Sequence, residues 1–132
     1  MTHDQLLQKA REAKAGAYAP YSHFRVGAAL LCKSGRIYTG ANVENASYSV
    51  TCCAERVALF KAVTEGEREF DAIAVTSDSE TLTFPCGVCR QALMEFSPGM
   101  DVIASNNGLD YKMTALETLL PDAFTGKEME QT

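Results

Sequence analysis

Two short cysteine-containing stretches constrain this chain more than any other part of its sequence. The first is Cys53-Ala54-Glu55-Arg56 and the second is Pro85-Cys86-Gly87-Val88-Cys89-Arg90. Each stands where a helix is expected to begin, and the positive end of a helix dipole favours a thiolate. Three protein ligands beside an open position are typical of catalytic zinc, whereas structural zinc takes four. The sequence therefore predicts a catalytic zinc site at Cys53, Cys86 and Cys89.

The residues around these thiols decide between several readings of the site. Glu55 follows Cys53 by two residues, close enough to act on a zinc-held water without binding the metal. Cys52 raises a question of register, and Cys53 is preferred because it alone stands two residues before Glu55. Cys32 lies in an apolar run and is expected to be a buried thiol. A redox Cys-x-x-Cys pair and a closed structural zinc are the alternatives. A redox Cys-x-x-Cys pair would not require Cys53 or Glu55. A closed structural zinc would need a further pair of ligands, and the sequence has no second Cys-x-x-Cys and no His pair.

Length and charge narrow the class of protein. The chain has 132 residues, and we expect residues 1–132 to form a single domain. A formal net charge of −5 argues against a nucleic-acid partner, because binding phosphates requires a Lys/Arg surface. No signal-peptide core is seen at the N-terminus, and no stretch reaches the length of a membrane span. The five cysteines, an odd number, indicate metal or free thiols in a reducing compartment, so we expect a cytoplasmic protein.

The hydrophobic pattern predicts alternating helices and strands. The segments 24–32, 72–75 and 102–104 are apolar on both faces, as buried strands are. Further strands are expected over 37–43 and 111–113. Helices are expected from a capping box at Thr2 to Gly16, over 53–65 with Gly66 as the stop, from Pro85 to about 97, and from a second capping box at Thr114 to Pro121. The tail from Gly126 is expected to be frayed. This order predicts a three-layer α-β-α sandwich with a mixed sheet of about five strands.

Several segments resemble the free-nucleoside cytidine deaminases, a family of zinc enzymes. Besides the cysteine stretches they are Tyr21–Leu30, Asn42–Ala46 and Leu119–Phe124, in order and at family-like spacing. The resemblance implies hydrolytic deamination of cytidine and 2′-deoxycytidine to uridine and 2′-deoxyuridine, in pyrimidine salvage. Ammonia is released, one zinc ion per subunit activates water, and Glu55 carries the proton. It also implies a small homotetramer whose subunits share their active sites.

The resemblance further implies which residues contact the nucleoside. They are Phe24, Asn42, Glu44, Ala46, Tyr48, Ala54 and Phe124. Asn42 and Glu44 would bind the ribose 3′-hydroxyl, and Phe24 would pack against the nucleoside. The backbone of Ala54 and the side chain of Glu55 would read the base edge. The remaining three would act across subunit interfaces: Ala46 and Tyr48 near a neighbour's ribose, and Phe124 on its base.

The expected charge of the metal site points to a role for Arg56. Zinc with three thiolates carries a net −1, which makes the metal a poorer Lewis acid. Arg56 follows Cys53 by three residues, so both can lie on one helix face, and its guanidinium is expected to balance this charge. The alternative for Arg56 is a surface ion pair.

Three rival functions remain open on the sequence. A blasticidin-S-type deaminase shares the cysteine motifs, although Asn42-Val43-Glu44-Asn45 favours the cytidine branch. A nucleic-acid-editing deaminase fits poorly with the acidic charge. A non-catalytic zinc module that binds a protein partner belongs to a different class, and release of ammonia from cytidine separates it from the enzymes.

Overall fold

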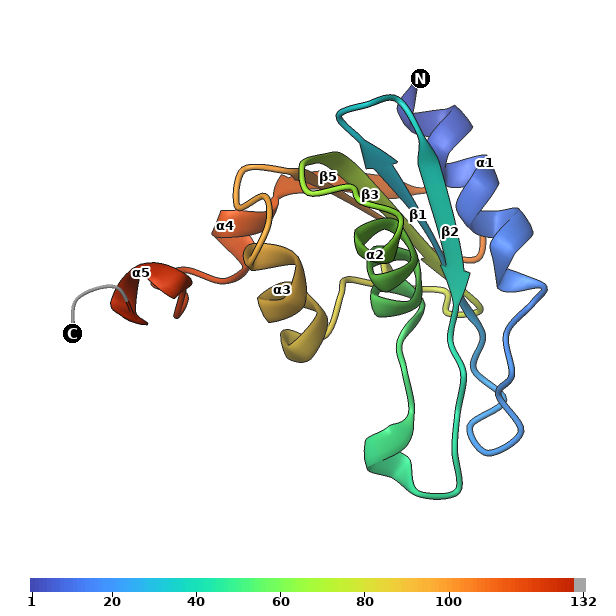
Figure 1. The fold of residues 1–132 in the computed structure, drawn as a ribbon. Helices are drawn as coiled ribbons and strands as arrows, with labels where there is room; N and C mark the ends of the chain where they lie inside the picture. Colours follow the sequence, from blue (N-terminus) through green and yellow to red (C-terminus); the bar gives the residue numbers. More distant parts are fainter. Residues whose placement is uncertain (130–132) are drawn as a thin grey trace.

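A five-stranded sheet forms the middle layer of the computed structural model, which describes residues 1–129 (Figure 1). The strands are β1 (Val26–Cys32), β2 (Ile37–Ala41), β3 (Phe70–Ser77), β4 (Asp101–Ser105) and β5 (Tyr111–Ala115). Their order is β2-β1-β3-β4-β5, and only the β3–β4 pair is parallel. The prediction of a mixed sheet of about five strands is therefore confirmed.

Helices cover both faces of this sheet. They are α1 (His3–Lys14), α2 (Ala54–Thr64), α3 (Gly87–Met94), α4 (Leu116–Leu119) and α5 (Gly126–Met129), with a 3-10 turn η1 (Tyr48–Val50). In Figure 1, α1 lies on one face of the sheet, and α2 and α3 lie on the other. The three-layer sandwich is therefore confirmed. Within residues 1–129, none of the helices is both long and apolar enough to cross a membrane.

Both faces of the central strands are buried, as their apolar sequences predict. Leu30 and Val75 pack into the core under α2 and α3, whereas Ala29 and Ala74 pack under α1. Burying a Val or Leu side chain contributes about 1.5–3 kcal/mol to the free energy of unfolding. The two cores hold the sheet rigid between the helix layers, so the segments that leave its edges start from fixed positions.

A glycine in β2 sets how closely α2 approaches the sheet. A Cβ atom at Gly40 would lie 2.5 Å from the carbonyl oxygen of Ala54 and 2.7 Å from the amide nitrogen of Ala58. No side chain fits in that space, so the first turn of α2 rests directly on the backbone of β2. The residue before α2, Cys53, is thereby fixed relative to the sheet.

Some predicted boundaries are wrong. β1 begins at Val26, so Phe24 precedes the strand, and β2 ends at Ala41 rather than at residue 43. The helix α3 ends at Met94. The sequence predicts a frayed tail from Gly126, but residues 126–129 form α5, and residues 130–132 lie outside the described part.

The second predicted capping box is also wrong. Thr114 lies in β5, where it pairs with Val102, and the residue before α4 is Ala115, whose side chain makes no capping bond. The Thr-x-x-Glu spacing is present, but strand pairing with β4 takes the threonine into the sheet. The first capping box is confirmed, because Thr2 and Gln5 bond each other's backbone at the start of α1.

Candidate metal centre and active site

Three thiols meet where two helices begin. Cys53 and Cys86 occupy the N-cap positions of α2 and α3, and Cys89 lies in the first turn of α3. Their three Sγ atoms lie within 4.8 Å of one another, and those of Cys53 and Cys86 are 3.8 Å apart. Tetrahedral zinc with bonds of about 2.3 Å holds its sulfur ligands about 3.8 Å apart, so this donor set fits zinc.

The other two cysteines lie outside this cluster. Cys52 pairs its backbone with Val43 in both directions, at N···O distances of 2.9 Å, and its thiol is not part of the cluster. Cys32 is buried at the end of β1, and burial raises the pKa of its thiol to about 11. Cys32 is therefore a neutral core thiol.

The surroundings of the cluster favour a thiolate at Cys53. A hydrogen bond from the Cys89 thiol has the largest effect and, together with Arg56, lowers the pKa of Cys53 to about 5. The same shared hydrogen bond, with burial, raises the pKa of Cys89. One proton is thus held between two sulfur atoms, and a cation placed among them would replace it.

A carboxyl group lies beside the thiols. Glu55 is the first-turn acidic residue of α2 and only 4% exposed. Burial is the main cause that raises the pKa of Glu55 to about 7. Near neutral pH such a carboxyl group can either accept or donate a proton, as general acid–base catalysis requires.

Arg56 reaches back from the same helix turn to the cluster. Its Nη2 lies 3.4 Å from Sγ of Cys53 and 3.5 Å from the carbonyl oxygen of Thr51. Its Nε is buried, and it has no hydrogen-bond partner among the described residues. The guanidinium is therefore directed at a thiol rather than at a surface carboxylate.

A cavity of about 250 Å³ opens beside the thiols. Its lining includes four of the residues that the resemblance assigns to the nucleoside: Phe24, Asn42, Glu44 and Ala54. Cys53, Cys86 and Glu55 line it as well. Five further lining residues were not predicted: Ser22, Val26, Thr51, Thr83 and Phe84. Thr83 and Phe84 come directly before Pro85 and the second cysteine stretch, and this proximity is the one feature of the sequence that could have indicated them as lining residues.

Asn42 and Glu44 hold the wall of this cavity together. The amide of Asn42 accepts a hydrogen bond from the Val26 N–H, at 2.9 Å, and donates one to the Phe24 carbonyl, at 2.8 Å. The Glu44 carboxylate accepts hydrogen bonds from the backbone N–H groups of Tyr21 and Ser22. These side chains therefore fasten the segment before β1 to the segment after β2.

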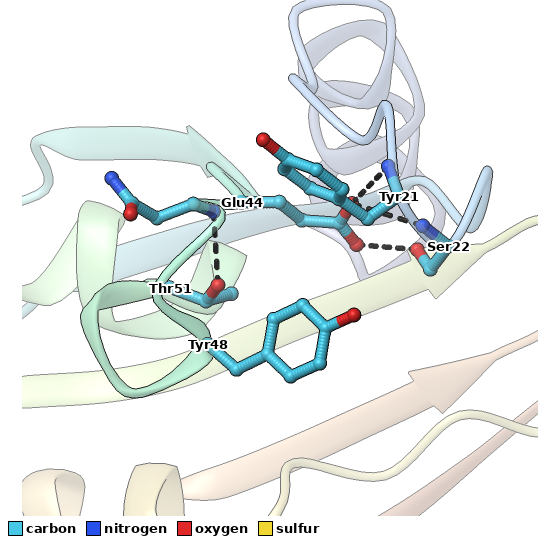
Figure 2. A pocket seen from close by; sticks show the side chains of 6 residues that line it. Tyr21, Ser22, Glu44, Tyr48 and Thr51 are labelled. Carbon is cyan, nitrogen blue, oxygen red and sulfur yellow. Dashed lines mark hydrogen bonds between the residues drawn. The ribbon is translucent and has the colours of Figure 1, made fainter.

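A second hollow of about 340 Å³ adjoins the first and shares Ser22, Glu44 and Thr51 with it. Figure 2 shows the Glu44 carboxylate directed at the chain at Tyr21 and Ser22, with the Tyr48 ring nearby. Tyr48 lies in η1 and is 77% exposed.

Two more predicted residues lie away from the first cavity. Ala46 is exposed in the loop before η1. Phe124 is 60% exposed, and its carbonyl oxygen accepts a hydrogen bond from Gln91 of α3, at 2.8 Å. Ala46, Tyr48 and Phe124 are thus surface residues in one subunit, and the cavity beside the thiols is formed without them.

Comparison with known families decides what kind of site this is. The sequence pattern "Cytidine and deoxycytidylate deaminase zinc-binding region" matches residues 1–105, which include all of the thiols and Glu55. The chain belongs to this family. Membership accounts for the zinc-compatible donor set, because the matching region is the one by which the family binds zinc.

Individual members of the family are similar to this chain in sequence and in structure. A cytidine deaminase of Halalkalibacterium halodurans is 48% identical over 130 residues, covering 98% of both chains. The crystal structure of cytidine deaminase from Burkholderia pseudomallei superimposes with a TM-score of 0.91 at 48% identity, covering 94% of this chain and 100% of that one. A blasticidin-S deaminase of Bacillus cereus is more distant, with 33% identity over 129 residues, or 92% of this chain and 91% of that protein.

Proposed function

We propose that this chain is a zinc-dependent hydrolase that deaminates cytidine and 2′-deoxycytidine. The observation that carries the proposal is the buried Glu55 carboxyl beside three thiols whose spacing fits zinc, at the end of an open cavity. The cavity and the acid argue against a non-catalytic zinc module, which needs neither. The higher identity to cytidine deaminases than to a blasticidin-S deaminase, 48% against 33%, favours the nucleoside substrate.

The metal site is assigned to Cys53, Cys86 and Cys89. Bound zinc supplies Lewis-acid chemistry, which makes a water molecule a better nucleophile near neutral pH. The N-termini of α2 and α3 stabilise negative charge on the thiolates, and Arg56 adds a full positive charge beside Cys53. We assign Arg56 the role of withdrawing charge from the sulfur atoms.

Glu55 is assigned as the proton carrier. Deamination adds water at C4 of the cytosine ring and expels the amino group as ammonia. In this assignment the Glu55 carboxylate accepts a proton from the attacking water and delivers it to N3. It then takes the remaining hydroxyl proton and passes it to the departing nitrogen, so a single group acts as base and acid.

The rest of the cavity is assigned to the nucleoside. With the reacting ring at the thiols and Glu55, the sugar is assigned to Asn42 and Glu44, which line the same cavity. Glu44 supplies an acceptor for a ribose hydroxyl, Phe24 an apolar wall, and the backbone of Ala54 a contact to the base edge. The acidic net charge of −5 disfavours nucleic acid as substrate.

Assembly and location extend the proposal. Tyr48, Val50 and Phe124 are each more than half exposed, so they are available for contact with a neighbouring subunit. We propose a homotetramer in which Ala46, Tyr48 and Phe124 complete neighbouring sites. The five cysteines are unpaired, in keeping with a reducing cytoplasm and a role in pyrimidine salvage.

A substrate panel tests the function directly. Purified, zinc-loaded protein is incubated with cytidine, 2′-deoxycytidine, blasticidin S and single-stranded DNA, and ammonia release is measured. We expect release from the first two substrates. Release from blasticidin S alone would establish the rival deaminase, and release from none would refute the enzyme assignment.

A further inference from the structure

The hydroxyl group of Ser22 connects two walls of the cavity. It donates a hydrogen bond to Oε2 of Glu44 and accepts one from the backbone N–H of Phe24, at 3.0 Å. All three residues line the cavity beside the thiols. Because a serine hydroxyl has one donor and two acceptor lone pairs, it can make both bonds at once.

Groups of the turn at Tyr21 and Ser22 occupy most of the hydrogen-bond acceptor sites of the Glu44 carboxylate. Its Oε1 accepts from the N–H groups of Tyr21, at 3.0 Å, and Ser22, at 3.1 Å, while Oε2 accepts the Ser22 hydroxyl (Figure 2). A carboxylate offers about four lone-pair sites, so one acceptor site, on Oε2, is left for a ligand. Hydrogen bonds from Ser22, and then from Tyr21, lower the pKa of Glu44, which keeps it an acceptor only.

The backbone between Ser22 and Phe24 is fixed as well. His23 has φ 58°, in the left-handed region, and its N–H donates to the Ala19 carbonyl, at 3.0 Å. This turn brings the Phe24 N–H over the Ser22 hydroxyl. The hydroxyl therefore fixes the aromatic wall and the polar wall relative to each other.

We propose that Ser22 is a positioning residue that sets which sugar hydroxyl the cavity selects. Its hydroxyl leaves Glu44 with a single acceptor site of fixed direction, and it holds Phe24 against the same ligand. The inference rests on the proposed function, which places the base at the thiols and the sugar at Glu44. Without the Ser22 hydroxyl, the Glu44 carboxylate has a second unoccupied acceptor site, and its side chain can rotate. The cavity then discriminates less between a nucleoside that has the correctly placed sugar hydroxyl and one that lacks it.

The test compares three variants on two substrates. Ser22→Ala removes the hydroxyl, Ser22→Thr keeps it, and Ser34→Ala is the matched control. Ser34 also donates to a glutamate, Glu67, at 2.9 and 3.0 Å, but outside the cavity. The values of kcat and KM are measured for cytidine and 3′-deoxycytidine on zinc-loaded protein.

For Ser22→Ala we expect KM for cytidine to rise about 10-fold with kcat within about 2-fold, as loss of a charged hydrogen bond predicts. The preference in kcat/KM for cytidine over 3′-deoxycytidine should fall about 5-fold. Ser22→Thr should keep most of both values, and Ser34→Ala should match the wild type. An unchanged preference in Ser22→Ala would overturn the proposal.

A structural readout separates this inference from the function on which it rests. Wild-type protein that releases no ammonia from cytidine would refute the proposed function. Hydrogen exchange at the Phe24 amide, measured by NMR, then decides the role of Ser22. Exchange about 5-fold faster in Ser22→Ala than in the wild type would support the connection between the two walls. Equal exchange would overturn it.

Discussion

Cys53 and Cys86 begin two different helices, yet their sulfur atoms lie 3.8 Å apart. The two residues are 33 positions apart in the chain, on either side of β3. The crossover from α2 through β3 to α3 thus brings two helix N-termini to one point, where thiolates are stabilised by both dipoles.

This arrangement predicts which cysteines hold zinc. Cys53→Ala, Cys86→Ala and Cys89→Ala should each lose bound zinc, because each removes one of three ligands. Cys52→Ala and Cys32→Ala are the matched controls and should keep it. Zinc per subunit is measured by atomic emission on the five purified variants. Full zinc in the Cys53 variant together with loss in the Cys52 variant would reverse the assignment.

The buried carboxyl predicts a large catalytic effect without loss of fold. Glu55→Gln keeps the shape of the side chain but removes the proton carrier, so kcat for cytidine should fall about 10²–10⁴-fold or more. Zinc content and the circular dichroism spectrum should stay those of the wild type. Turnover close to the wild-type rate in a zinc-loaded variant would show that another group carries the proton.

The contact between Arg56 and Cys53 predicts an effect of charge. Arg56→Gln should retain zinc but lose activity by about 10-fold, because the extra negative charge of the thiolates is no longer offset. Adding Cys53→His should restore part of the loss, since the new ligand is neutral. Arg68→Gln is the control: Arg68 bonds the Val63 and Glu67 carbonyls at the far end of α2. Arg68→Gln should be fully active. If zinc-loaded Arg56→Gln were as active as the wild type, Arg56 would not balance the charge of the thiolates.

The exposed Phe124 predicts that subunits share sites. Phe124→Ala should raise KM for cytidine, because an aromatic contact of about 1 kcal/mol or more to the base is lost. Mixed assemblies of Phe124→Ala and Glu55→Gln subunits should regain activity, up to roughly a quarter of the wild-type sites by random mixing. Activity is measured after dissociation and reassembly, beside each variant alone. A monomer that is fully active in sedimentation under assay conditions would contradict shared sites.

The ion cluster at Asp78 predicts a pH dependence of stability. Hydrogen bonds from Arg25, at 3.0 and 3.1 Å, and then from Lys14 hold the pKa of Asp78 well below its usual value, against the effect of partial burial. Its contribution is therefore complete above the unfolded-state pKa of about 3.9 and is lost as the pH falls toward the folded-state value.

Asp78→Asn should therefore lower the free energy of unfolding by about 1 kcal/mol at pH 7, and by less at pH 3. The measurement is urea unfolding at fixed protein concentration. Asp71→Asn, at an exposed position of β3, is the control and should have little effect. A difference for Asp78→Asn that stays constant between the two pH values would rule out this linkage.

The sequence predicted those parts of the structure whose pattern is local and repeated. Runs that are apolar on both faces located β1 and β3, and the Thr2 capping box located α1. The same kind of reasoning failed at Thr114, because pairing of β5 with β4 outweighs a local capping preference. A four-residue pattern carries no information about a strand partner that lies elsewhere in the chain.

The cysteines and Glu55 could be found from sequence because their chemistry requires fixed residue types at fixed spacing. Ser22, Thr51 and Thr83 could not be found this way, since serine and threonine are common in loops for many reasons. They line the cavity only because the segments that carry them converge in the folded chain. The same convergence gives the Asn42 amide its contacts to Phe24 and Val26, which its position at the end of a strand does not reveal.

The absent side chain of Gly40 has a consequence for how the site tolerates change. Any larger residue there would push on the Ala54 carbonyl and hence on the peptide that joins Ala54 to Glu55. The displacement would therefore act on the first turn of α2, which carries Glu55 and directly follows Cys53. At this position a hydrogen atom sets the spacing between β2 and the helix turn that carries Glu55.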